Sequence, residues 1–122
     1  MQRLLVVLLV SGATQAHARD YVVRWAGERT SLVEQFDRHL KAELLRRGDT
    51  VVDEARGEGA IVLQPTVVLS GGALVLEVVG VMARSHALLG AVRTRAKVRG
   101  LVRDAVVQAL VLRSCSDARF GD

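Results

Sequence analysis

The sequence predicts an α+β domain in which two helices pack on one face of a mainly antiparallel sheet. Two segments of helical period, residues 31–47 and 100–113, flank a block of strand-like segments. The last three of those segments are separated by short turns, which is typical of a three-strand meander. Helices gathered on one face of the sheet are the natural packing for this order of elements. Aromatic residues make up only 3% of the chain, so we expect an aliphatic core.

The first 18 residues have the pattern of a secretory signal peptide. Arg3 supplies the positive start, residues 4–10 are apolar, and Ala16 and Ala18 frame an A-x-A cleavage site. This apolar run is far shorter than the ~20 residues that span a bilayer, which argues against a retained anchor. We therefore expect an exported protein, periplasmic or secreted. Its single domain would cover residues 19–113, followed by a loose tail over 114–122.

A short strand and then a well-marked helix open the predicted domain. Residues 21–25 are rich in β-branched and aromatic side chains, which favours a strand. Ser31 is the expected N-cap, because Glu34 follows three residues later as in a capping box. Gly48 is the expected stop. The polar face of this helix places acids four residues before bases, which predicts three ion pairs: Glu34 with Arg38, Asp37 with Lys41, and Glu43 with Arg47.

Four further strands are expected between the helices. Residues 50–53 form a short strand, and residues 60–69, 73–83 and 87–98 form the meander, with a hairpin turn at Gly71 and Gly72. The middle run is apolar on both faces apart from Glu77, so it is predicted to be a central strand. Pro65 fits an edge position or a bulge better than a central one.

The second helix is expected over residues 100–113. Its apolar side chains form a broad face, which includes Leu101 and Leu110 and predicts a buried position. The tail that follows has no periodicity.

Several kinds of site lack their sequence signature. Cys115 is the only cysteine, which excludes a disulfide framework and a cysteine-rich metal site. His39 and His86 have no metal-ligand spacing, and the glycines at 71 and 72 lack the phosphate-loop pattern. We therefore expect no metal, no cofactor and no enzymatic activity.

A basic stripe is the most prominent predicted surface feature. Arg93, Arg95 and Lys97 alternate along one strand and so share one face, with Arg99 just beyond. Such a face is suited to an anionic lipid, lipopolysaccharide or an acidic protein. The alternative is an edge strand whose charges prevent aggregation. The net charge of +4 is mild and not concentrated in one dense cluster, so we do not expect nucleic-acid binding.

Two acids, Glu77 and Asp104, keep an enzymatic alternative open. Glu77 lies in the middle of an apolar strand, where a buried acid can be functional. The competing interpretation is an exposed acid paired with Arg93 or Arg95 on the next strand.

The succession of segments resembles a small periplasmic α/β domain. The residues that carry the resemblance are Arg47–Val52 at the end of the first helix, Gly59–Gln64, Leu74–Val79 and the Arg24–Trp25 pair. This domain is shared by the amino-terminal domain of the Tol–Pal β-propeller protein and the curli-secretion lipoprotein family. The chain is also similar to the auxiliary lipoprotein of lipid-transport ABC systems, and it is this resemblance that the Arg24–Trp25 pair before the first helix carries. It departs from the lipoproteins, because no cysteine follows the apolar run.

The resemblance implies a non-enzymatic accessory or binding module in envelope assembly or transport. It carries over no functional residue by position. Binding of anionic lipid or lipopolysaccharide through the basic stripe is the first alternative, and a small enzyme using Glu77 or Asp104 is the second.

Overall fold

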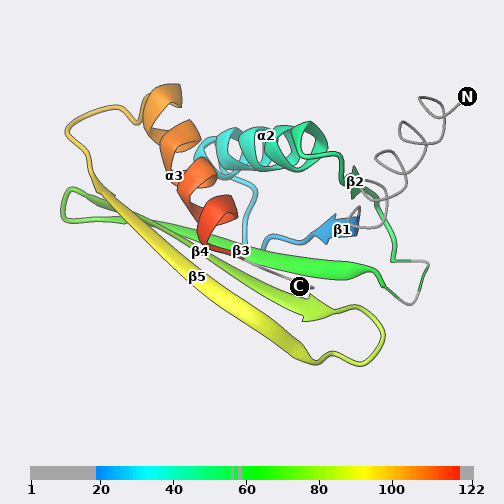
Figure 1. Ribbon diagram of the computed structural model, residues 1–122. Helices are drawn as coiled ribbons and strands as arrows, with labels where there is room; N and C mark the ends of the chain where they lie inside the picture. The colour runs from blue at the N-terminus through cyan, green and yellow to red at the C-terminus, as the bar shows by residue number, and fades with distance from the viewer. Residues whose placement is uncertain (1–18, 56, 58, 119–122) are drawn as a thin grey trace, which may run out of the picture.

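The computed structural model describes residues 19–55, 57 and 59–118, which form two helices on one face of a five-stranded open sheet (Figure 1). The α+β prediction is therefore confirmed. The predicted signal peptide, with Ala16 and Ala18, lies outside the described residues. The elements are β1 (Asp20–Val23), α2 (Ser31–Arg46), β2 (Thr50–Val51), β3 (Ile61–Ser70), β4 (Ala73–Met82), β5 (Leu88–Lys97) and α3 (Asp104–Asp117).

The strand order is β2-β1-β3-β4-β5. β1 is parallel to both β2 and β3, with Tyr21 level with Val51 on one side and Ile61 on the other. β3, β4 and β5 form the expected antiparallel meander. β4 lies between two strands, as its apolar faces predicted, and β5 and β2 are the two edges of the sheet.

The first helix begins as expected but is capped by a different residue. Thr30 is the N-cap, and its Oγ1 accepts a hydrogen bond of 3.2 Å from the backbone N–H of Val33. Ser31, the predicted cap, is the first helical residue. Glu34 accepts from Arg29 at 2.8 Å instead of pairing with Arg38, because Arg29 in the preceding loop reaches the same carboxylate.

Strand pairing and turn geometry in the meander explain the positions of Pro65 and of the two turn glycines. β1 ends beside Leu63, whose carbonyl accepts the last hydrogen bond from the N–H of Arg24 at 2.8 Å. Pro65 follows two residues later on the same side of β3, where no β1 residue remains to pair with, so its missing N–H costs nothing. Gly71 and Gly72 have φ values of 57° and 78°, the conformation that a two-residue hairpin turn requires.

The second helix is shifted relative to its prediction. It starts at Asp104 because Gly100 adopts a φ of 73°, which breaks the chain before the helix. Leu101 is consequently 92% exposed in the connecting loop instead of buried. The helix continues to Asp117, so Ser114 and Cys115 belong to it and not to a loose tail. The buried hydroxyl of Ser114 lies 2.9 Å from that of Thr94 on β5, which ties the last turns to the sheet.

The core lies between the helices and one face of the sheet. Leu74, Leu76 and Val78 of β4 point toward the helices and are at most 2% exposed, and Phe36 of α2 is fully buried against them. α3 contacts β4 and β5, and α2 contacts α3 and β2. All the helices described therefore cover the same face.

Candidate functional site

The opposite face of β3, β4 and β5 has no helix of the described chain over it (Figure 1). We call it the open sheet face. The strand register places its side chains in rows across the three strands. Its members are Val62, Gln64, Thr66, Val68 and Ser70 on β3, Ala73, Val75, Glu77, Val79 and Val81 on β4, and Leu88, Ala91, Arg93, Arg95 and Lys97 on β5. Val62, at the start of β3, is buried, whereas Val68 further along the strand is exposed.

The open sheet face changes in character from one end to the other. Near the turn between β4 and β5 it is apolar, with Val79, Val81 and Leu88, and Leu88 is 68% exposed. At the opposite end it becomes basic, with Arg95 and Lys97. One surface therefore offers an apolar region for burial and a charged region that attracts anions.

Arg93 and Glu77 form an ion pair where the two regions meet. The Arg93 guanidinium donates two hydrogen bonds to Oε2 of Glu77, at 2.8 and 3.1 Å, across the register of β4 and β5. Glu77 is thus a surface acid with a basic partner, as one of the two sequence interpretations expected. An exposed pair of this kind contributes little to stability.

The rest of the basic stripe has no such partner. Arg95 and Lys97 are exposed on β5, and Arg99 is exposed just beyond its end. Within the described part of the chain, no acidic side chain forms an ion pair with any of the three. Three positive charges therefore remain available to a partner at one end of the open sheet face.

The strand that carries the stripe is an edge. Among the residues that the structure describes, β5 pairs with β4 on one side only, so no described strand pairs with the backbone N–H and C=O groups of its other side. An edge position is what we expect if the charges of β5 prevent aggregation. An edge strand is also where a strand of another protein can pair.

An acidic groove lies at the opposite edge of the sheet. It has a volume of about 590 Å³ and is lined by Asp20, Val51, Val52, Asp53 and Glu54. Asp20 and Asp53 are exposed. No local pattern in the sequence marks these acids, because strand pairing alone brings Asp20 beside residues that are 30 and more positions away.

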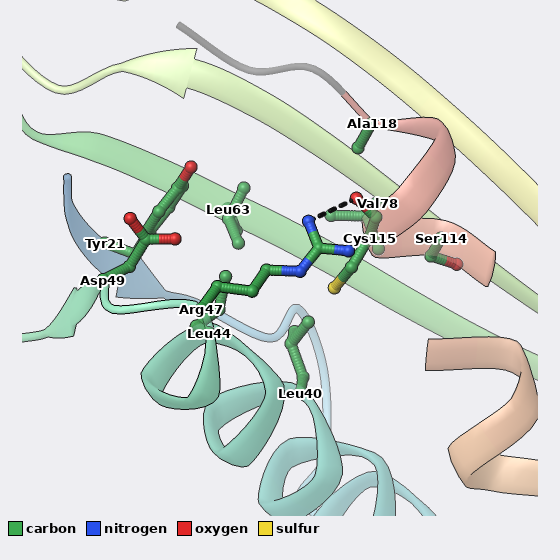
Figure 2. Close-up of a pocket in the computed structure, with 10 residues that line it drawn as sticks. All are labelled: Tyr21, Leu40, Leu44, Arg47, Asp49, Leu63, Val78, Ser114, Cys115 and Ala118. Atoms are coloured by element: carbon green, nitrogen blue, oxygen red, sulfur yellow. Dashed lines mark hydrogen bonds between the residues drawn. The ribbon is translucent and has the colours of Figure 1, made fainter. Parts of the chain in front are cut away.

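A small cavity lies between α2, the end of α3 and the sheet (Figure 2). Its volume is about 30 Å³, which is room for roughly one water molecule and far below the ~300 Å³ of a typical ligand pocket. The guanidinium of Arg47 donates to the backbone carbonyl of Cys115 at 2.7 Å across it, as the dashed line in Figure 2 shows. The cavity therefore belongs to the packing of the two helix ends.

Cys115 lines this cavity as a buried free thiol. Burial raises the pKa of Cys115 to about 11, although the charge of Arg47 acts in the opposite direction. A thiol with so high a pKa carries almost no thiolate at neutral pH and is a poor nucleophile.

A buried carboxylate joins the loop after β1 to α2. Asp37 is 5% exposed and accepts from Trp25 Nε1 at 2.8 Å, with Lys41 at 3.0 Å and Arg29 at 3.3 Å. Burial acts to raise the pKa of Asp37, but the hydrogen bonds and positive charges of these partners hold it below its ordinary value. The pair with Lys41, predicted from helical spacing, is confirmed, whereas no sequence pattern indicated the contact with Trp25.

Asp104 stands at the start of α3, where it joins the two helices. It accepts from Gln35 Nε2 at 2.6 Å and lies 3.5 Å from Nε2 of His39. The hydrogen bond from Gln35, followed by that from His39, lowers the pKa of Asp104. Among the described residues, no group of His, Cys, Asp and Glu side chains is arranged to hold a metal ion.

Comparison with known proteins shows a shared fold. No family model matches the sequence, and no curated protein matches it. The structure is similar to PelC from Paraburkholderia phytofirmans, solved as a dodecamer, with a TM-score of 0.57 and 13% identity over 81% of this chain and 83% of that chain.

Two further solved structures match this chain over most of its length. A PDZ domain protein from Parabacteroides distasonis matches with a TM-score of 0.52 and 11% identity over 83% of this chain, but over only 33% of its own. A minor lipoprotein from Acinetobacter baumannii matches at 14% identity over 77% of this chain and 87% of that chain, with a TM-score of 0.46, which is too weak to carry an argument. None of the helices that the structure describes has the length and apolar character needed to cross a membrane.

Proposed function

We propose that this protein is a non-enzymatic accessory module of the cell envelope that binds another envelope protein through its open sheet face. The observation that carries the proposal is a three-stranded surface with no described helix over it, on which Leu88 is 68% and Val68 is 55% exposed. Exposed apolar side chains gathered on one face, beside polar and charged ones, are typical of interaction surfaces.

Three other observations support the proposal. The first 18 residues have the composition of an export signal. The fold is shared with PelC, which forms a dodecamer, so a domain of this shape is compatible with an assembly. Glu77 and Asp104, the two acids considered for catalysis, each hold a structural partner, namely Arg93 and Gln35.

Crosslinking in native envelopes tests the proposal. We expect one protein to be recovered reproducibly with the wild-type chain, and its mature amino terminus to be Arg19. Leu88→Asp should abolish recovery, because it places a charge in the apolar region of the open sheet face. Leu101→Asp is the matched control, since Leu101 is also exposed but lies in the loop before α3. Equal recovery with both variants, or no partner with the wild type, would contradict the proposal.

The basic stripe favours a second candidate, binding to anionic lipid or lipopolysaccharide. Arg95, Lys97 and Arg99 are exposed and lack acidic partners in the described chain. Flotation with vesicles that contain phosphatidylglycerol distinguishes the two candidates. Lipid binding predicts that the wild type floats, that high salt prevents it, and that Arg95→Ala with Lys97→Ala abolishes it, whereas Leu88→Asp has little effect.

A further inference from the structure

The basic end of the open sheet face has no acid in its own rows. In the register of β4 and β5, Arg95 lies opposite Val75 and Lys97 lies opposite Ala73. The β3 residues in the same two rows are also uncharged. Neither base has an acidic partner within the described part of the chain. An acid that neutralises either base in its own row must therefore come from the outer side of β5.

The backbone of β5 at these positions points away from β4. The N–H of Val98 donates to the carbonyl of Gly72 at 2.8 Å, so the backbone groups of Val98 face β4. Because these groups alternate in direction along a strand, those of Arg93, Arg95 and Lys97 face outward. Among the described residues, no strand pairs with this outer side. Each exposed base thus has its own N–H and C=O at the open edge.

From these two observations we infer that the β5 edge binds an extended acidic segment of the partner protein, which adds to the sheet as a strand. We assign it the antiparallel direction, which is the more stable pairing per residue. Its acids are two positions apart, so that one lies opposite Arg95 and the next opposite Lys97. The residue opposite Arg93 is uncharged, because Glu77 already pairs with Arg93 at 2.8 Å.

This inference rests on the proposed function and names the chemistry of the partner. It concerns the edge and the basic end of the open sheet face, whereas the crosslinking test concerns the apolar end with Leu88. The two can therefore fail separately.

A strand fits this edge better than a lipid headgroup does. Side chains two residues apart on a strand are about 7 Å apart, and this spacing is the same on both strands of a pair. Two acids at alternate positions therefore meet two bases at alternate positions, with the Cβ atoms of each pair about 5 Å apart. A headgroup can neutralise the charges, but it does not supply the alternating donors and acceptors that an open strand edge pairs with.

Two synthetic peptides of the same composition test the inference. In the first, Val-Thr-Val-Glu-Thr-Glu-Val-Thr-Val, both glutamates lie on one face of a strand. In the second, Val-Thr-Val-Glu-Glu-Thr-Val-Thr-Val, they lie on opposite faces. Both ends of each peptide are blocked, so that only the glutamates are charged. Fluorescence anisotropy measures binding to the full chain, exported and recovered as the cell processes it. At low salt we expect the first peptide to bind about tenfold more tightly than the second.

A charge reversal in the protein should reverse the preference. Arg95→Glu with Lys97→Glu should weaken binding of the first peptide about tenfold and favour a peptide with lysines in place of its glutamates. Arg38→Glu with Arg113→Glu is the matched control, because it makes the same change in net charge at exposed positions of α2 and α3. We expect this control to bind as the wild type does. Circular dichroism checks that both variants are folded.

Amide hydrogen exchange separates strand addition from attraction between charges. The outward N–H groups of Arg93, Arg95 and Lys97 should exchange more slowly when the first peptide is bound. A version of this peptide with both glutamates N-methylated keeps its charge but loses the N–H donors that face β5. We expect it to bind more weakly and to leave the three amides unprotected. Binding of the first peptide without this protection would overturn the inference.

Two further outcomes would also overturn it. One is equal affinity for the two peptides, and the other is binding of the first peptide that the reversal at Arg95 and Lys97 leaves unchanged. Flotation with phosphatidylglycerol vesicles in the absence of peptide binding would assign the basic stripe to lipid instead. In all these cases the proposed function stands if Leu88→Asp still abolishes crosslinked recovery. Peptide binding with amide protection, together with recovery that Leu88→Asp leaves unchanged, would keep the edge site and contradict the proposed function.

Discussion

The two faces of β4 differ although they alternate along the same ten residues. Leu74, Leu76 and Val78 face the helices and are at most 2% exposed, whereas Val75 and Val79, on the open sheet face, are only half-buried. Both sets are aliphatic, so composition does not distinguish them. Their difference comes from what lies above them, and it separates residues that stabilise the fold from residues that are available for recognition.

Replacing one leucine on the covered face should have the largest effect on stability. We expect Leu76→Ala to lower the free energy of unfolding by about 3 kcal/mol, because it leaves a cavity under the helices. Val79→Ala on the open sheet face should cost less than ~1 kcal/mol. Urea denaturation followed by circular dichroism measures both, and similar losses for the two variants would show that the faces do not differ in this way.

The buried carboxylate of α2 should come next. Asp37→Asn removes the charge that Lys41 and Arg29 face but keeps the size of the side chain, and we expect a loss of about 2 kcal/mol at pH 7. Asp53→Asn, at an exposed position, is the matched control and should change stability by less than ~0.5 kcal/mol. Equal stability of the two variants would show that the contacts of the Asp37 carboxylate do not stabilise the fold.

The carboxylate of Asp37 also makes the stability of the fold depend on pH. The pKa of Asp37 is lower in the folded chain than its ordinary value. Its stabilising contribution is therefore complete above about pH 4, the ordinary range of an aspartate, and is lost as the pH falls through the lower folded value. Unfolding curves from pH 7 to pH 2 should show a smaller acid-induced loss in Asp37→Asn than in the wild type. Parallel curves would contradict this assignment.

A pair of hydroxyls on the covered side should have an intermediate effect. Thr94 and Ser114 bond each other at 2.9 Å in the interior, between β5 and α3. Thr94→Val and Ser114→Ala should each cost about 1 kcal/mol, since each leaves a buried hydroxyl without this partner. The double variant should lose less than the sum of the two. Strict additivity in a double-mutant cycle would argue against the bond.

The smallest effect is expected on the open sheet face. Glu77→Gln breaks an ion pair with Arg93 in which the arginine side chain is 71% exposed, so the loss should stay below ~0.5 kcal/mol and shrink further in high salt. A loss as large as that of Asp37→Asn would mean that this face contributes to stability more than its exposure suggests.

Sequence periodicity predicted the features that depend on residues close together in the chain. The first helix and the three meander strands follow from apolar spacing, and the basic stripe follows from alternation along one strand. The pairs of Asp37 with Lys41 and of Glu43 with Arg47, at 3.0 and 3.4 Å, follow from helical spacing. Each of these features is fixed within a few residues of chain.

Features that depend on distant parts of the chain could not be predicted in this way. Trp25 reaches Asp37 because the loop after β1 folds back over α2. The start of α3 was misplaced because Gly100 breaks the chain and no side chain caps the helix. The acidic groove at the β2 edge exists only once β1 and β2 are paired, so no local pattern indicates it.

The parallel position of β1 has a consequence for the order of folding. β3, β4 and β5 are consecutive and joined by short turns, so this part of the sheet forms with little loss of chain entropy. β1 is made first, yet its partner β3 begins some 40 residues later, after α2 and β2 have been synthesised. We therefore expect the chain to add its first strand to a sheet that its later residues have already begun, so that mutations in β1 act more on the late steps of folding than on nucleation.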